Sequence, residues 1–350
     1  MKKLKTVVSG LGRIGWQFHI PSICAHAGFE LVGVSDPVEE RLQEAKDAFG
    51  VNCYTDYFKM VDAEKPDLVV ICSPTHVHAE QAIYAMEKGH DVFLDKPMAR
   101  DLEEAQKIAD VSRRTGKKLM LYQPHRASAP SQVLKKLLDS GVIGDVFLMK
   151  LANLSFVFRN DWQAFKKYGG GMLNNYGAHE IDRALFFTRS HAEKISGAMA
   201  RIASLGDADD FVKILMETKN GVNVDIEVNM ACAIEFSRTM VYGTNGAISF
   251  GWDSEGPHFK VRHFDPKDKD SIPLNESLAA PGRKYMGEGS SPTSWKEELH
   301  RITNDDAINF YDKCYEFYVM GKEPFVPLGD TLAVMRIMNE CRKYANWSQD

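Results

Sequence analysis

The sequence lacks the features that mark several classes of protein. No apolar run approaches the roughly 20 residues that a membrane-spanning helix requires. The six cysteines include no C-x-x-C pair, and the first residues show neither the apolar core nor the cleavage site of a signal peptide. The formal charge of −5 is opposite in sign to the basic surface that nucleic-acid binding favours. We therefore expect a cytoplasmic protein with reduced thiols, no membrane association and no nucleic-acid partner.

Internal repeats and low-complexity tracts are absent as well, and the composition is that of an ordinary globular protein, with 44% hydrophobic and 26% charged residues. A chain of 350 residues is longer than one hydrophobic core usually serves. We therefore expect two domains, residues 1–124 and residues 125–350, with the border where the pattern of strands and helices changes.

A glycine motif is the first feature that the sequence does contain. The segment "VVSGLGRIGWQFH" places Gly-x-Gly-x-x-Gly at Gly10, Gly12 and Gly15. The pattern predicts a buried strand over 4–9 before the motif and a helix over 14–27 after it. In this context the glycines permit a tight turn, close approach of a pyrophosphate and close packing of the helix on the strand. The free N–H groups at the start of the helix favour the phosphates.

A second strand, predicted over 29–36, ends at Asp36. The number of residues between the glycine motif and Asp36 is typical of an acidic residue that binds the adenine-ribose hydroxyls and disfavours a 2′-phosphate. This spacing predicts NAD as cofactor. Arg13 could tolerate that phosphate, so NADP stays open as an alternative. The helix between the two strands contains Pro21, which we expect to break it.

Strands and helices continue to alternate through the first domain, which predicts a parallel sheet with helices on both faces. The predicted strands are 67–73, 91–97 and 118–123, and the predicted helices are 78–89 and 102–115. Ligands of such sheets bind beyond the carboxyl ends of the strands. The residues that we expect to bind the cofactor there are Gly10, Gly12, Arg13, Ile14, Gly15, Asp36, Ser73, Pro74, Thr75, His78, Asp95, Lys96 and Pro97.

The second domain begins with a predicted helix over 130–140 and continues with long segments of alternating polarity. These segments are 145–158, 193–203, 210–230 and 237–250, with hairpin turns at Asn220-Gly221 and Asn245-Gly246. Two helices, over 296–319 and 329–345, are predicted to close the chain. The Ser-, Gly- and Pro-rich region 275–294 is predicted to be a long excursion that covers the site or reaches a partner subunit.

The segment "GGGMLNNYGAHEID", residues 169–182, is a candidate site. Its three glycines mark a loop that something bulky approaches closely. On the helix that follows, the spacing of Asn175, His179 and Asp182 predicts one shared face. The alternative is a histidine that caps a helix or binds a neighbour in the core, and this stretch alone leaves both interpretations open.

The order of these motifs gives a specific resemblance. The glycine motif is followed by Ser73-Pro-Thr-His-Val-His78, by Lys96-Pro97, and by a triple glycine with His179-x-x-Asp182. In this order they resemble the glucose–fructose oxidoreductase/inositol dehydrogenase (Gfo/Idh/MocA) family over essentially the whole chain. The expected fold is therefore α/β plus α+β, with an N-terminal Rossmann doubly wound parallel sheet and a C-terminal, largely antiparallel, open-faced sheet with helices.

The resemblance also implies an activity and site residues. Family members bind a nicotinamide cofactor, hold a sugar, polyol or cyclitol against the open-faced sheet, and are usually homodimers or homotetramers. The lysine of the family's Glu-Lys-Pro motif touches the reacting hydroxyl and the cofactor; Lys96 matches this lysine, and Asp95 replaces the glutamate. The family's acid/base histidine matches His179. Where related members carry an aspartate four residues earlier, this chain has Asn175.

The remaining candidates have two interpretations each. Gln123 and Arg126 lie on the predicted rim; Arg126 either binds substrate or pairs with an acid at the domain junction. Trp162 either stacks on a sugar ring or packs at an interface. His76 and His78 form an H-x-H pair, but sequence places no third ligand beside them, so we expect no metal.

Together these residues predict an NAD(P)-dependent dehydrogenase that oxidises a secondary alcohol of a sugar, sugar derivative or cyclitol. The expected catalytic residues are Lys96, His179 and Asn175, and the expected substrate-binding residues are Gln123, Arg126, Trp162, Asn175 and His179. Two alternatives are an epimerase or eliminating glycosidase that retains its NAD, and a sugar sensor that binds dinucleotide without chemistry.

Overall fold

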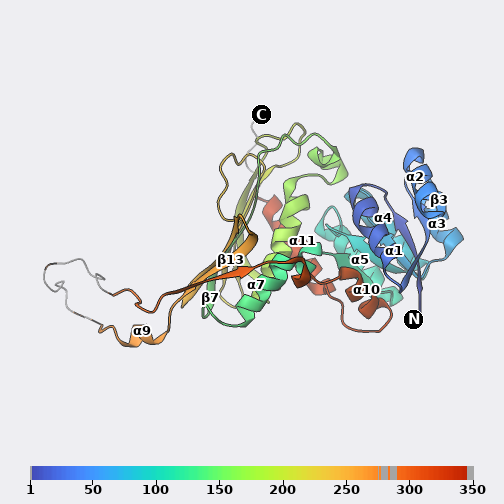
Figure 1. The fold of residues 1–350 in the computed structure, drawn as a ribbon. Coiled ribbons are helices and arrows are strands. Elements are labelled where there is room, and N and C mark those ends of the chain that lie inside the picture. The colour runs from blue at the N-terminus through green and yellow to red at the C-terminus, as the bar shows by residue number, and fades with distance from the viewer. Residues whose placement is uncertain (1, 275, 277–282, 284–289, 345–350) are drawn as a thin grey trace.

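The computed structural model describes residues 2–274, 276, 283 and 290–344. They form two sheets, one of six strands and one of eight, each with its own helices (Figure 1). Within these residues, no helix combines the length and apolar character needed to cross a membrane. The excursion predicted over 275–294 lies mostly outside the described residues.

The first sheet is parallel throughout and has the order β3-β2-β1-β4-β5-β6, which confirms the predicted doubly wound domain. Its strands are apolar because helices cover them, and β4 is fully buried. The strands are β1 (Leu4–Ser9), β2 (Phe29–Ser35), β3 (Asn52–Tyr54), β4 (Leu68–Ile71), β5 (Asp91–Asp95) and β6 (Leu119–Tyr122). The helices are α1 (Ile20–Ala25), α2 (Glu39–Phe49), α3 (Tyr57–Glu64), α4 (His78–Glu87) and α5 (Leu102–Thr115).

The helix after the glycine motif differs from the prediction. A π-helical turn over Gly15–His19 runs directly into α1, so Pro21 does not break the helix. Pro21 lies in the first turn of α1, where a missing N–H is tolerated. The predicted break was therefore wrong.

The second sheet has the order β14-β13-β12-β11-β7-β10-β9-β8. Only β7 and β10 pair in parallel, so the sheet is largely antiparallel, as predicted. Its strands are β7 (Val146–Leu154), β8 (Ala192–Ala200), β9 (Phe211–Thr218), β10 (Asn223–Asn229), β11 (Thr239–Gly243), β12 (Gly246–Asp253), β13 (Gly256–His263) and β14 (Lys296–Arg301). The helices of this part are α6 (Pro124–Ala127), α7 (Ala129–Asp139), α8 (Ala178–Thr188) and the short α9 (Lys267–Asp270).

The helix predicted over 296–319 is wrong in its first half. Residues 296–301 form β14, the edge strand of the second sheet, and the α-helix of this segment is α10 (Phe310–Tyr318), preceded by a short 3-10 turn over Asn304–Asp306. The residues of β14 are good helix formers, but they pair with β13, and Glu297 binds Lys260 on that strand. Strand pairing and cross-strand charges override a weak local propensity here.

Of the last two helices, α10 packs on the first sheet and the final helix contacts both parts of the molecule. In α10, the Phe310 ring stacks on Phe93 of β5, and the Tyr318 hydroxyl donates to the carbonyl of Val92. The final helix, α11 (Leu328–Arg342), packs on α5 and β6 and also on α8 and β8. The predicted border after residue 124 falls inside the short helix α6, just beyond β6, whereas α10 packs on the first sheet.

Candidate active site

A cavity of about 490 Å³ lies beyond the carboxyl ends of the parallel strands, between them and the second domain. Residues that follow β1, β2, β4 and β5 line one side, and the loops and helix start around 159–179 line the other. The lining residues are Gly10, Gly12, Arg13, Ile14, Asp36, Arg41, Cys72, Ser73, Pro74, Thr75, Asp95, Lys96, Pro97, Tyr122, Pro124, Arg159, Asp161, Trp162, Gln163, Gly169, Gly170, Gly171, Asn174, Asn175, Tyr176 and His179.

The glycine loop has the shape that a dinucleotide needs. Gly10 has a φ of +94°, and a Cβ there would lie 2.7 Å from the carbonyl oxygen of Cys72. A Cβ on Gly15 would lie 2.0 Å from the carbonyl oxygen of Gly10, so the start of the helix packs too closely on the loop after β1 for a side chain at this position. A Cβ on Gly12 would meet nothing within 4 Å. Gly12 therefore borders open space inside the cavity, and this cradle fits a pyrophosphate.

Asp36 lies at the end of β2 and is almost fully buried at the cavity wall. Its Oδ2 accepts hydrogen bonds from the N–H of Leu11 at 2.7 Å and from Nη1 of Arg41 at 3.3 Å. Its Oδ1 accepts from the N–H of Val38 at 3.0 Å. One lone pair of Oδ1 therefore stays available for a ribose hydroxyl. Arg41 was missed from the sequence, although it lies only five residues beyond Asp36.

Not every residue expected at the cofactor lies on the cavity wall. Ser73, Pro74 and Thr75 line it, whereas His78 lies behind them. The two ring nitrogens of His78 lie 2.8 Å from the Ser73 carbonyl oxygen and 2.9 Å from that of Pro97. Its ring thus holds two rim segments together. In the described part of the chain, no group of three or more His, Cys, Asp and Glu residues could hold a metal ion.

Lys96 follows β5 and enters the cavity from the first domain. Its Nζ donates to the carbonyl oxygen and to Oδ1 of Asn175, both at 3.0 Å. Burial lowers the pKa of Lys96 to about 8; the nearby carboxylate of Asp95 opposes this shift, and Arg13 and Arg159 add to it. An ammonium has three N–H donors, and Asn175 accepts hydrogen bonds from two of them. The third has no partner among the described residues and is available to a ligand.

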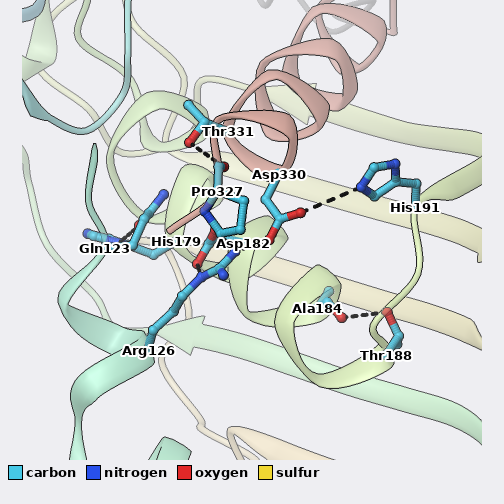
Figure 2. A network of polar contacts seen from close by, with 10 residues as sticks. All are labelled: Gln123, Arg126, His179, Asp182, Ala184, Thr188, His191, Pro327, Asp330 and Thr331. Atoms are coloured by element: carbon cyan, nitrogen blue, oxygen red, sulfur yellow. Dashed lines mark hydrogen bonds and ion pairs between the residues drawn. The ribbon is translucent and has the colours of Figure 1, made fainter. Parts of the chain in front are cut away.

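His179 enters the cavity from the second domain, in the first turn of α8. Its Nδ1 lies 3.0 Å from Oε1 of Gln123 (Figure 2). Burial holds the pKa of His179 well below its usual value, and the positive charge of Lys96 acts in the same direction. The imidazole is therefore neutral at pH 7.

Asn175 belongs to a π-helical turn, Leu173–Gly177, that precedes α8. Besides binding Lys96, it donates from Nδ2 to Oε1 of Gln163 at 3.2 Å. Asn175 and His179 both line the cavity, but no hydrogen bond joins them in the described structure. The amide that touches His179 belongs to Gln123, while Asn175 holds the lysine.

Arg126 and Asp182 do not line the cavity. The guanidinium of Arg126 donates to both carboxylate oxygens of Asp182, at 2.8 and 2.7 Å, and to Asp330 at 2.9 Å (Figure 2). Both side chains of the Arg126–Asp182 pair are almost completely buried. Of the two interpretations of Arg126, the structure supports the pairing with acids at the domain junction. Gln123 likewise lies behind the cavity wall rather than on it.

The segment 159–163 supplies more of the cavity than sequence reasoning assigned to it. Trp162 lines the cavity with 40% of its surface exposed. Its neighbours Arg159, Asp161 and Gln163 also line it, and Arg159 forms two hydrogen bonds with Asp161. The Arg–x–Asp–x–Gln spacing was visible in the sequence, but nothing local placed these side chains at a cavity.

Comparisons with known proteins agree with this architecture. Residues 4–123 match the model of the "Oxidoreductase family, NAD-binding Rossmann fold", and residues 131–249 match that of the "GFO/IDH/MocA C-terminal domain". D-glucoside 3-dehydrogenase of Escherichia coli K12 is 30% identical to this chain, over 52% of this chain and 53% of that protein. The scyllo-inositol 2-dehydrogenase (NAD(+)) of Bacillus subtilis 168 is 26% identical over 71% and 74%.

Solved structures agree over nearly the full length. An NAD-binding protein from Listeria innocua superposes with a TM-score of 0.84 and 25% identity, covering 99% of this chain and 98% of that one. The yvaA protein of Bacillus subtilis, described as a putative oxidoreductase, has a TM-score of 0.82 at 16% identity and so supports the fold alone. With both of its domains matched by the family's models, the chain belongs to the GFO/IDH/MocA family of oxidoreductases.

Proposed function

We propose that this protein is an NAD-dependent dehydrogenase that oxidises a secondary alcohol of a sugar, a sugar derivative or a cyclitol. The observation that carries the proposal is the pairing of Lys96 and His179 in one cavity with different protonation states. At pH 7 a lysine with a pKa of about 8 is mostly charged, while His179 is neutral. These are the states that alcohol oxidation needs.

In this mechanism His179 takes the hydroxyl proton of the substrate. The ammonium of Lys96 donates its remaining N–H to the same oxygen and stabilises the negative charge that develops there. Asn175 binds the other two donors of Lys96 and so orients the third. When bound, NAD supplies the acceptor for the hydride that leaves the carbinol carbon.

The substrate class rests on the lining and on the relatives. The side of the cavity that the second domain supplies offers amides, a tryptophan side chain and an arginine already bound to Asp161, a set that suits hydroxyl groups better than a charged substrate. The relatives cited above are named as dehydrogenases of a glucoside and of an inositol. Both are compounds with several secondary hydroxyls.

The cofactor is proposed to be NAD rather than NADP. Asp36 keeps one lone pair for a ribose hydroxyl, and its charge opposes a 2′-phosphate. Arg41 and Arg13 line the same cavity and lessen this opposition. The preference is therefore expected to be moderate, and Asp36→Ser should reduce it.

The test is a panel of sugars, glycosides and cyclitols incubated with the purified protein and NAD, followed through the near-ultraviolet absorbance of reduced nicotinamide. Substrate-dependent reduction of NAD by the native protein, lost in His179→Ala, is the expected result. No reduction with any member, combined with NAD that copurifies and a product that is epimerised or cleaved, would overturn the proposal in favour of an enzyme that retains its cofactor.

A further inference from the structure

The contact between His179 and Gln123 is one of two parallel contacts that join the end of β6 and α6 to α8. Gln123 binds His179, and three residues further along both segments Arg126 binds Asp182 (Figure 2). The second contact is a buried, two-pronged ion pair that also reaches Asp330 in the first turn of α11. Such a pair fixes the helix rigidly, so the distance between Gln123 and His179 is set by the fold.

The chemistry of this contact selects one form of the imidazole. Oε1 of an amide only accepts hydrogen bonds, so Nδ1 of His179 carries the proton that bonds to it. A neutral imidazole then has its lone pair on Nε2. Nε2 has no hydrogen-bond partner among the described residues, and it is not completely buried. It is therefore open to the cavity that His179 lines.

We propose that Gln123 is a positioning residue that holds His179 in the tautomer with a basic Nε2 facing the substrate. The proposal rests on the function proposed above, in which His179 takes the hydroxyl proton. Gln123 itself has no contact with the cavity and acts only through the imidazole. In this chain an amide occupies the place beside the histidine that a carboxylate takes in many catalytic pairs.

The surroundings of His179 support this assignment. The ring of His125, in α6, packs edge-to-face against it with centroids 4.2 Å apart, which restricts rotation of the imidazole. The titratable groups that act on His179 are Lys96 from the end of β5, His125 from α6 and Arg183 from its own helix. None is a carboxylate, and burial lowers the pKa of His125 to about 3, so that ring is uncharged. An amide at position 123 therefore sets the tautomer without adding a charge.

A substitution to glutamate tests the chemistry of the contact. In Gln123→Glu the carboxylate accepts from the same Nδ1–H but also stabilises the imidazolium, so the pKa of His179 rises. The acid limb of kcat/KM for oxidation should move up by about one unit or more. Above that limb the variant should turn over at close to the native rate. An acid limb that stays in place would show that the side chain at position 123 does not contact the imidazole of the base, and would overturn the proposal.

A substitution to methionine removes the acceptor and keeps the volume. Gln123→Met should lower kcat by about tenfold or more, with little change in KM, because part of the histidine adopts the wrong tautomer. Gln132→Met is the matched control, since Gln132 donates from α7 to the Arg126 carbonyl and lies away from the cavity. It should keep the native kcat.

The decisive measurement is nitrogen NMR of protein labelled with ¹⁵N-histidine, with the His179 signal assigned from a His179→Ala variant. At neutral pH the native protein should show Nδ1 protonated and Nε2 unprotonated, and Gln123→Met should show a mixture of the two tautomers. A native protein with the proton on Nε2, or a tautomer ratio unchanged in Gln123→Met, would overturn the proposal. Because this readout needs no turnover, it separates failure of the tautomer assignment from failure of the proposed dehydrogenase activity.

Discussion

Lys96 is the residue whose chemistry depends most on its surroundings. Its ammonium is partly desolvated and is held by two oxygens of a neutral residue, Asn175, instead of a carboxylate. It therefore keeps a charge at neutral pH that is only weakly stabilised and is available to an oxygen of the substrate.

Replacement of Lys96 should affect the chemical step more than binding. We expect Lys96→Met to lower kcat by about 100-fold or more, because the developing alkoxide loses its only ammonium partner among the described residues. The Kd for NAD, measured by calorimetry, should change little. Lys107→Met, on the exposed side of α5, is the control and should leave both quantities unchanged. Near-native turnover of Lys96→Met would remove Lys96 from the mechanism.

Asn175 should control the pKa of Lys96. In Asn175→Asp a carboxylate replaces the amide oxygen that lies 3.0 Å from Nζ, and it stabilises the ammonium. The pKa of Lys96 should then rise above its value of about 8, and each unit of that rise corresponds to about 1.4 kcal/mol. The measurement is the pH at which kcat/KM begins to fall on the alkaline side. An alkaline limb that stays in place would contradict the contact.

At the scale of elements, two residues of the glycine loop are expected to serve different purposes, Gly15 the packing of the fold and Gly12 the binding of the cofactor. A Cβ at position 15 would meet backbone at 2.0 Å, whereas a Cβ at position 12 would meet nothing within 4 Å. We expect Gly15→Ala to destabilise the fold by about 1–3 kcal/mol, measured by denaturant unfolding. Gly12→Ala should unfold like the native protein but bind NAD more weakly by calorimetry. Equal losses of stability in the two variants would contradict this separation.

The junction between α6 and α8 depends on a buried ion pair. Asp182→Ala leaves the buried guanidinium of Arg126 with only Asp330, and we expect a loss of about 3 kcal/mol in unfolding free energy. The control is Asp139→Ala, which removes solvent-accessible ion pairs with Lys135 and Arg189 and should cost only about 1 kcal/mol. A small effect of Asp182→Ala would mean that the pair contributes nothing net to stability.

For the molecule as a whole, local patterns predicted the first domain well. Strand, glycine motif, helix and acid follow one another within 36 residues, and Lys96 and His179 were both expected at one site, where the structure brings them together. The expected homodimer or homotetramer stays a prediction.

Features that depend on distant partners were not predictable. The pairing of β14 with β13 overrides helix-forming residues, and the role of Arg126 is decided by Asp182 and Asp330, which are far away in the sequence. The partner of His179 turned out to be Gln123 for the same reason, because helix spacing indicates a shared face but not which side chain lies opposite.

The proposed catalytic pair, Lys96 and His179, is divided between the two domains, and the pH dependence of oxidation tests the proposed roles of the two residues most directly. The measurement is kcat/KM for NAD-dependent oxidation of the best substrate from the panel, as a function of pH. If His179 is the base and charged Lys96 stabilises the alkoxide, kcat/KM should stay level around neutral pH and fall above about pH 8, where Lys96 loses its proton. A rate that instead rises through this range would make neutral Lys96 the base and contradict the account.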